Sequence, residues 1–368
     1  MAFTIASIYQ YLYLSVVAIL TFISLGRYKN CSALYGENNS LRGTLLTIIA
    51  SLGIGLRPIS GHFVDMSAYA LSIRRLRGET FVFTTDTDNV IFDNLIQWWG
   101  CSGFSEHSFF LIIATIYFVC AFMGIKRLFP NHSSISFLVF LGAFSTFSYA
   151  TNGIKAGAAA SIFLLALGYI DKLWISIPLM LISYGFHHSM VLPLAAFAVA
   201  FLVKNPKLFY FGWLFCFILA CLHVSYFQSL FGSLADEQGS LYLLATPETT
   251  AGRIGFRPDF ALYSAVPVWL GYQIEIKNRY SISGTYRILQ HFYLTANAIW
   301  MLCMYAPFTN RIAYLSWFVY PILIIYPFLD KENQDPYKMS KFRKAVLYHL
   351  FFTLFMYIVY YGLLSHGR

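Results

Sequence analysis

Long runs of apolar residues, separated by short polar segments, cover most of the chain. A helix that crosses a membrane needs about 20 apolar residues, and fewer where it is short or re-entrant. By this measure the pattern predicts helices at residues 7–25, 43–56, 108–125, 134–151, 156–170, 173–186, 189–203, 208–229, 260–274, 288–305, 312–329 and 345–364. The longest connections lie at about 57–107 and 230–259. We therefore expect an all-α, polytopic transmembrane bundle of about twelve helices, forming a single integral membrane domain over residues 1–368.

Composition excludes a soluble globular fold. Hydrophobic residues make up 58% of the chain and charged residues only 11%, whereas soluble domains carry about 25% charged residues. Mean hydropathy is +0.62. The net charge of +9 would suggest nucleic acid in a soluble protein. In a membrane protein, basic residues gather instead in cytoplasmic loops, so we expect membrane lipid as the surroundings and no nucleic-acid partner.

The distribution of basic residues predicts an orientation. With the N-terminus outside, 16 of the 25 lysines and arginines fall in inner loops, and the acidic residues lean the other way. This arrangement follows the positive-inside rule. It also has a consequence for the polar residues that end or interrupt apolar helices, because most of them then fall on the outer side. They are Arg57, Asp65, Asn152, Lys155, His187, His188, Arg253, Arg257 and Arg311.

Ionisable residues at membrane depth are costly and therefore indicate function, but each of these has a simpler interpretation. Arg57 alone could be an interfacial anchor whose charged end reaches the headgroups. The His187–His188 pair could merely cap its helix. Asp86 and Asp88, in TTDTDN, resemble the metal-binding DxD of soluble sugar transferases, although three letters favour a loop turn. The cysteines have no metal-ligand spacing, so we expect neither a metal nor a cofactor.

Taken together, the outer residues suit an anionic ligand. Arginine stays charged at biological pH and presents a planar fork to phosphate oxygens, so several arginines facing one pocket would hold a diphosphate without a metal. Asp65 or His187 could accept a proton near neutral pH, and the pattern prefers neither. This chemistry describes glycosyl transfer from a lipid-linked donor, because the lipid diphosphate is already a good leaving group.

Four short motifs resemble the EpsG family of bacterial membrane proteins, which are similar to Wzy-type polysaccharide polymerases. The first is an arginine that closes the second helix, followed by Asp and Tyr, here Arg57, Asp65 and Tyr69. The second is the outer turn that opens an Ala-rich helix, here Asn152 to Ala156. The others are the Phe-His-x-Ser tip at 186–189 and the arginine before Ile-Ala-Tyr at 311–314. The resemblance covers about residues 45–330.

The resemblance implies a membrane polymerase of GT-C-like architecture. It would join undecaprenyl-diphosphate-linked oligosaccharide units at the outer face of the bacterial cytoplasmic membrane, for capsule, O-antigen or exopolysaccharide synthesis. It implies as partners the lipid-linked glycan, and a chain-length regulator and a flippase of the same pathway. Arg57, Asp65, His187 and Arg311 would be catalytic. The substrate-binding residues would be Tyr69, Asn152, Lys155, His188, Arg253 and Arg257. Lys155 departs from the usual arginine and lacks its bidentate fork.

Two other classes of protein share some of these features. A transporter or flippase of lipid-linked sugars would also be a bundle with buried charges, but it should show repeated halves and midplane polar residues. A membrane acyltransferase that modifies polysaccharide would use a histidine and a nearby acid. The His187–His188 tip supplies the histidine but no acid at a matching position on the same helix.

Overall fold

The computed structural model describes residues 4–27, 40–63, 65–224, 226–227, 255–279, 281–306 and 309–360. Within those ranges every regular element is a helix, as the apolar pattern predicts. The chain forms two compact units. Unit 1 comprises Met1–His187 and Pro336–Arg368, and unit 2 comprises His188–Asp335.

Unit 1 contains most of the helices that the structure describes. They are α1 (Ile5–Arg27), α2 (Ser40–Gly55), α3 (Met66–Arg75), α4 (Val90–Cys101), α5 (Glu106–Leu128), α6 (Ser133–Leu141), α7 (Thr146–Thr151), α8 (Ile154–Leu167), α9 (Leu173–Phe186) and α18 (Lys338–Phe355). A short 3-10 helix lies at Gly61–Phe63, and a π-helical turn at Met356–Tyr360 continues α18.

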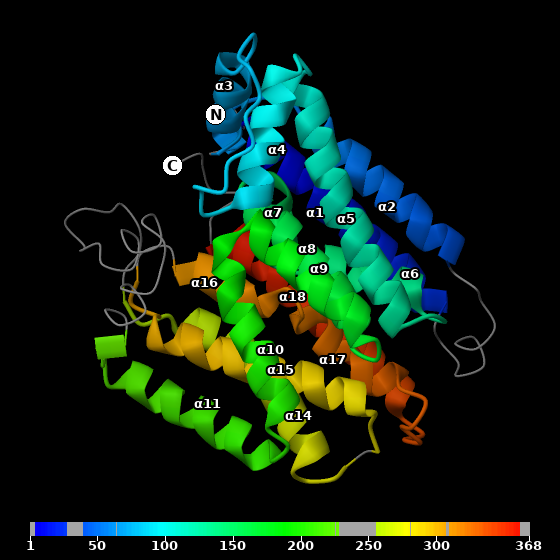
Figure 1. Cartoon of the computed structure of the whole chain (residues 1–368). Coiled ribbons are helices and arrows are strands. Elements are labelled where there is room, and N and C mark those ends of the chain that lie inside the picture. The colour runs from blue at the N-terminus through cyan, green and yellow to red at the C-terminus, as the bar shows by residue number, and fades with distance from the viewer. Residues whose placement is uncertain are drawn as a thin grey trace. The chain divides into compact units, whose positions relative to one another are not determined.

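Helix α8 forms the centre of unit 1, and almost all of its residues are buried. It packs against α5 and α9 (Figure 1). Gly124 lets α5 approach closely, because a Cβ there would lie 2.7 Å from the carbonyl oxygen of Leu164. From α9, the Ser183 hydroxyl donates to the carbonyl of Ala159 at 2.7 Å. Small residues and interhelical hydroxyl bonds are the usual means of joining helices in lipid.

The outer faces of several helices are apolar. Leu12 of α1 and Ile49 of α2 are 65% and 64% exposed, which suits contact with lipid tails. Among the described residues, four helices are long and apolar enough to cross a membrane: Ile5–Gly26, Glu106–Leu128, Thr309–Leu329 and Lys338–Val359. Several shorter apolar helices accompany them. The chain is therefore a membrane protein.

The helix predicted at 134–151 is interrupted between α6 and α7, where Gly142 ends the first part. An interruption frees backbone carbonyls, which must find donors in apolar surroundings. Side-chain hydroxyls supply them. Tyr13 of α1 donates to the carbonyl of Leu141 at 2.6 Å, and Thr146 donates to that of Phe140 at 2.7 Å.

Unit 2 is built around one central helix. Its elements are a 3-10 helix (His188–Met190), α10 (Val191–Leu202), α11 (Pro206–Cys221), α14 (Pro258–Glu275), α15 (Gly284–Leu302), α16 (Thr309–Trp317) and α17 (Tyr320–Leu329). Helix α15 contacts each of the five other α-helices that the structure describes in this unit. The predicted helix at 312–329 divides into α16 and α17, because Pro321 lies in the first turn of α17 and has no N–H to continue the preceding helix.

A buried polar network joins four helices of unit 2. The Asn297 amide of α15 accepts a hydrogen bond from Trp213 of α11 at 2.8 Å. It donates to the hydroxyls of Ser264 on α14 and Ser316 on α16, at 3.1 and 3.0 Å. Trp317 also donates to Ser264, at 2.8 Å. Such bonds fix which helices are neighbours, because an unpaired polar group is costly in this setting.

The connection predicted at 57–107 is more structured than a simple loop. It contains α3 and α4, as well as the 3-10 helix at Gly61–Phe63. These elements belong to unit 1, and they bring predicted site residues together.

Candidate active site

Unit 1 holds six of the ten residues predicted to form the site, namely Arg57, Asp65, Tyr69, Asn152, Lys155 and His187. Unit 2 holds His188, Arg257 and Arg311. Arg253 lies outside the described residues. In unit 1 the six residues lie at helix ends that the charge distribution predicts to be on the outer side.

Arg57 follows α2 and is only 1% exposed. Its Nη1 donates to the carbonyl of Ile54 at 2.7 Å, and its Nη2 donates to that of Thr151 at 2.8 Å. Its guanidinium carbon lies 5.2 and 5.6 Å from the ring centres of Phe63 and Phe110. Burial lowers the pKa of Arg57 to about 10, so it stays charged at neutral pH. Arg57 therefore fastens the end of α2 to the end of α7.

The carbonyl that Arg57 binds belongs to the turn between α7 and α8. Asn152 ends α7, and its side-chain Oδ1 is buried without a hydrogen-bond partner. Gly157 allows the chain to fold back here, since a Cβ at that position would lie 2.5 Å from the carbonyl oxygen of Tyr149. Lys155 stands in the first turn of α8. Arg57 thus holds in place the turn that carries two other predicted site residues.

Phe92 of α4 lies at the meeting point of four other helices. Its ring is 1% exposed and packs against Tyr69 of α3 at 5.5 Å between ring centres. Lys155 of α8 places its Nζ 5.6 Å from the centre of the same ring. The ring also contacts Phe109 of α5 and Phe186 of α9, at 5.9 and 6.5 Å. Because His187 follows Phe186 directly, this cluster draws Tyr69, Lys155 and His187 towards one region.

Asp93 is a further candidate for the site, and the sequence did not reveal it. It follows Phe92 on α4, and its Oδ1 lies 4.0 Å from Nζ of Lys155. The two side chains are 34% and 18% exposed. In the sequence, Asp93 is one polar residue in a helix of mixed composition. Its partner Lys155 lies on another helix, so no short sequence motif contains both residues.

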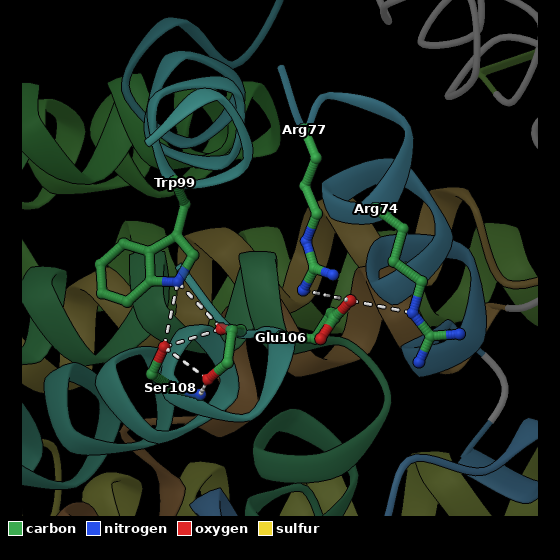
Figure 2. A network of polar contacts seen from close by, with 6 residues as sticks. Arg74, Arg77, Trp99, Glu106 and Ser108 are labelled. Carbon is green, nitrogen blue, oxygen red and sulfur yellow. Dashed lines mark hydrogen bonds and ion pairs between the residues drawn. The ribbon is translucent and has the colours of Figure 1, made fainter. Parts of the chain in front are cut away.

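A buried carboxylate holds α3 against α5. The Glu106 side chain is 9% exposed and accepts hydrogen bonds from Arg74 Nε at 2.8 Å and Arg77 Nη2 at 3.1 Å. Figure 2 shows both arginine side chains directed at this carboxylate, with Trp99 directed at Ser108 beside it. Arg74 and Arg77 are therefore paired with an acid although their side chains are 57% and 48% exposed. Since α3 also carries Tyr69, the clamp helps to position that residue.

Asp65 occupies the position before α3, but its side chain forms no capping hydrogen bond to the helix. Its backbone carbonyl accepts from the amide of Tyr69 at 3.2 Å. The side chain is half-buried. Asp65 follows Phe63 by two residues in the sequence, and the Phe63 ring contacts the guanidinium of Arg57.

The predicted arginines of unit 2 have different surroundings. Arg257 forms a bidentate pair with Asp259, at 3.0 Å from Nε and 2.6 Å from Nη2, and its guanidinium carbon lies 3.6 Å from the centre of the Phe260 ring. Both charged side chains are nearly buried. Arg311, in α16, is exposed. Arg257 is thus already neutralised by its neighbour, whereas Arg311 lies at the surface of its unit.

Unit 2 also contains a buried acid that sequence reasoning missed. The Glu275 side chain is 2% exposed. Its Oε2 accepts a hydrogen bond from Tyr210 at 2.9 Å and lies 3.3 Å from Nε2 of His291. Phe209 stacks on the His291 ring at 4.1 Å. The signal in the sequence is the isolated Glu at the end of an apolar helix.

Chemically, unit 1 offers two cations, two carboxylates, an unpaired amide oxygen and a histidine, and of these Lys155 and Asp93 lie at the Phe92 cluster. These groups are able to bind a phosphate or a sugar and to accept a proton. No three His, Cys, Asp or Glu side chains lie close enough to hold a metal ion in the portion of the chain that is described.

Comparison with known proteins gives one match. The sequence model of the EpsG family matches residues 40–367. No curated protein and no solved structure matches the chain significantly.

Proposed function

This chain belongs to the EpsG family, and on that premise we propose that it is a membrane polymerase that joins undecaprenyl-diphosphate-linked oligosaccharide units. The family is associated with Wzy-like polymerases, which suggests an exopolysaccharide-related polymerase with glycosyltransferase-like activity. The lipid-linked donor, the joining of repeat units and the residues involved are parts of the proposal.

The observation that carries the proposal is the gathering of polar groups in unit 1. Arg57 ties the end of α2 to the turn that holds Asn152 and Lys155, and the Phe92 cluster gathers Tyr69, Lys155 and the end of α9. Five helices thus contribute to one region. Polar groups held in place by such packing can bind a substrate without rearrangement during the reaction.

The proposed reaction breaks the bond between the anomeric carbon of the growing glycan and its lipid diphosphate. A sugar hydroxyl of the next unit attacks that carbon, and Asp65 or His187 accepts the hydroxyl proton. The diphosphate leaves with the bonding electrons. Asn152, Lys155, Tyr69 and His188 contact the substrate, and Arg253 and Arg311 hold the diphosphate or the glycan. Arg257 joins them by exchanging its pair with Asp259 for the ligand. Arg57, being buried, supports the site chiefly by positioning its turn.

The proposal places this reaction at the outer face of the bacterial cytoplasmic membrane, with the N-terminus outside. The inner excess of basic residues supports this orientation. A flippase of the same pathway would deliver each lipid-linked unit, and a chain-length regulator would act on the product.

The first test uses cells that lack this gene and accumulate single lipid-linked units. These units are extracted and added to proteoliposomes that contain the purified full-length chain. A polymerase lengthens the units, a flippase carries them across the bilayer unchanged, and an acyltransferase adds an acyl group. Crossing or acylation without lengthening would reject the proposed function.

The second test returns variants to the same cells. Arg57→Ala, Asp65→Asn, His187→Ala and Arg311→Ala are each expected to shorten the surface polysaccharide seen on gels. Arg127→Ala is the control, because Arg127 forms a half-exposed pair with Asp171 at 2.6 Å, on the predicted inner side. If long chains persist in every variant that reaches the membrane, the site is assigned wrongly.

A further inference from the structure

Asp93 and Lys155 are two opposite charges whose hydrogen-bonding groups are unused. Both side chains are partly buried, at 34% and 18% exposed, and their closest atoms are 4.0 Å apart. In the described part of the chain, the Asp93 carboxylate accepts no hydrogen bond and the Lys155 ammonium donates none. Leaving charged groups without hydrogen bonds in a partly buried position costs free energy. A ligand group that bonds to both atoms would offset this cost.

In three acid–arginine pairs of the described chain, by contrast, the two charged groups are joined by a direct hydrogen bond. Arg127 and Asp171 lie 2.6 Å apart, as do Arg257 and Asp259, and Arg74 lies 2.8 Å from Glu106. A charge-assisted hydrogen bond has a length of about 2.7–2.9 Å. Asp93 and Lys155 are more than 1 Å too far apart to form one. The pair is therefore open.

The backbone on both sides of Asp93 is held firmly, so the starting position of its carboxylate is set by the surrounding packing. Phe92 before it is buried in the aromatic cluster. Asn94 after it is also buried, and its amide bonds to the backbone N–H and C=O of Thr84 at 2.9 and 2.7 Å. It donates to the carbonyl of Val90 at 2.7 Å as well. The backbone of Asp93 thus lies between two buried residues whose positions are set by packing and hydrogen bonds, which is how preorganised binding groups are supported.

One oxygen atom of the right kind would fill the gap. If an oxygen lay about 2.7 Å from both atoms, the Nζ–O–Oδ1 angle would be about 95°. That angle is close to the tetrahedral directions of a hydroxyl hydrogen and a hydroxyl lone pair. A hydroxyl both donates and accepts, which matches a carboxylate on one side and an ammonium on the other. A phosphate oxygen only accepts, so it would meet repulsion from Asp93.

We propose that Asp93 and Lys155 together bind one sugar hydroxyl of the lipid-linked unit, which donates to Asp93 and accepts from Lys155. The inference rests on the proposed function and assigns this part of the site to the glycan rather than to the diphosphate. Asp93 and Lys155 are then specificity-determining residues, because a sugar that lacks the hydroxyl or points it elsewhere leaves two charges unpaired.

The test compares two probes that differ only in the sugar. One is undecaprenyl diphosphate, and the other is the lipid-linked unit extracted from cells that lack the gene. Dissociation constants are measured for the purified full-length chain in detergent, together with its unfolding temperature. The variants are Asp93→Asn, Lys155→Met and the two combined, which keeps the net charge unchanged. The matched control is Arg127→Met with Asp171→Asn, which removes a closed pair.

Lys155→Met and the double variant are expected to bind the lipid-linked unit about 10- to 100-fold more weakly, because charge-assisted hydrogen bonds are lost. Asp93→Asn keeps an oxygen that accepts from the hydroxyl but loses the charge, so it should weaken binding by only about 10-fold. Binding of undecaprenyl diphosphate and the unfolding temperature should match those of the unaltered chain. Equal weakening towards both probes would overturn the inference, because the pair would then hold the diphosphate or maintain the structure. Unchanged binding of both probes would also overturn it. If the unaltered chain binds neither probe, the proposed function fails instead.

Discussion

Replacing Arg57 by lysine separates the role of its charge from the role of its planar fork. The guanidinium donates to two backbone carbonyls, of Ile54 and Thr151, that belong to different helix ends. A single ammonium cannot occupy both donor positions, so Arg57→Lys loses at least one of these bonds. A hydrogen bond to a charged group contributes about 1.5–3 kcal/mol, and part of the attraction to the two aromatic rings is lost as well. We expect unfolding to become easier by about 2–3 kcal/mol.

Thermal unfolding of the purified chain in detergent measures this cost. For a folded unit of roughly 150–250 residues, the size class of unit 1, the expected loss lowers the unfolding temperature by roughly 4–12 °C. Arg127→Lys is the matched control, because Arg127 also contacts an aromatic ring, that of Tyr169 at 5.3 Å. It differs in being 39% exposed, so its replacement should cost no more than about 1 kcal/mol.

The reasoning also predicts an effect on activity. Arg57→Lys should loosen the turn that carries Asn152 and Lys155, and a displacement of about 1 Å in a substrate-positioning group costs on the order of 100-fold in rate. If Arg57→Lys unfolds at or above the temperature of the Arg127→Lys control, the two carbonyl bonds do not secure this turn and the argument is refuted.

Three further variants and one control test the packing by the same unfolding measurement. Glu106→Gln should cost about 1–2 kcal/mol, because the two arginines it releases are half-exposed and become hydrated; no loss would show that the clamp is dispensable. Gly124→Ala should cost about 1–3 kcal/mol through its clash with the α8 backbone, whereas Gly53→Ala, with open space around it, should be neutral or stabilising by up to about 1 kcal/mol. Asn297→Leu should cost about 2–4 kcal/mol, since it leaves three buried polar groups without this partner; an unchanged unfolding temperature would contradict that role.

The candidate site was partly predictable from the sequence. Arg57, Asn152, Lys155 and Tyr69 could be selected because each interrupts or ends an apolar run, or lies in a short motif. Asp93 could not, because its significance depends on Lys155, which lies on another helix. Pairing across helices depends on how the chain folds back, and no local pattern records it.

The sequence alone determined the helical class and the membrane setting. Both follow from properties that add up along the chain, namely long apolar runs and few charges. A soluble core could not bury so much apolar sequence. Tertiary structure decided where those runs are interrupted and which side chains meet. The break between α6 and α7 persists because Tyr13 and Thr146 satisfy the freed carbonyls. The turn after α7 is likewise held by Arg57. In apolar surroundings every backbone group needs a partner, and only the folded chain brings those partners within reach.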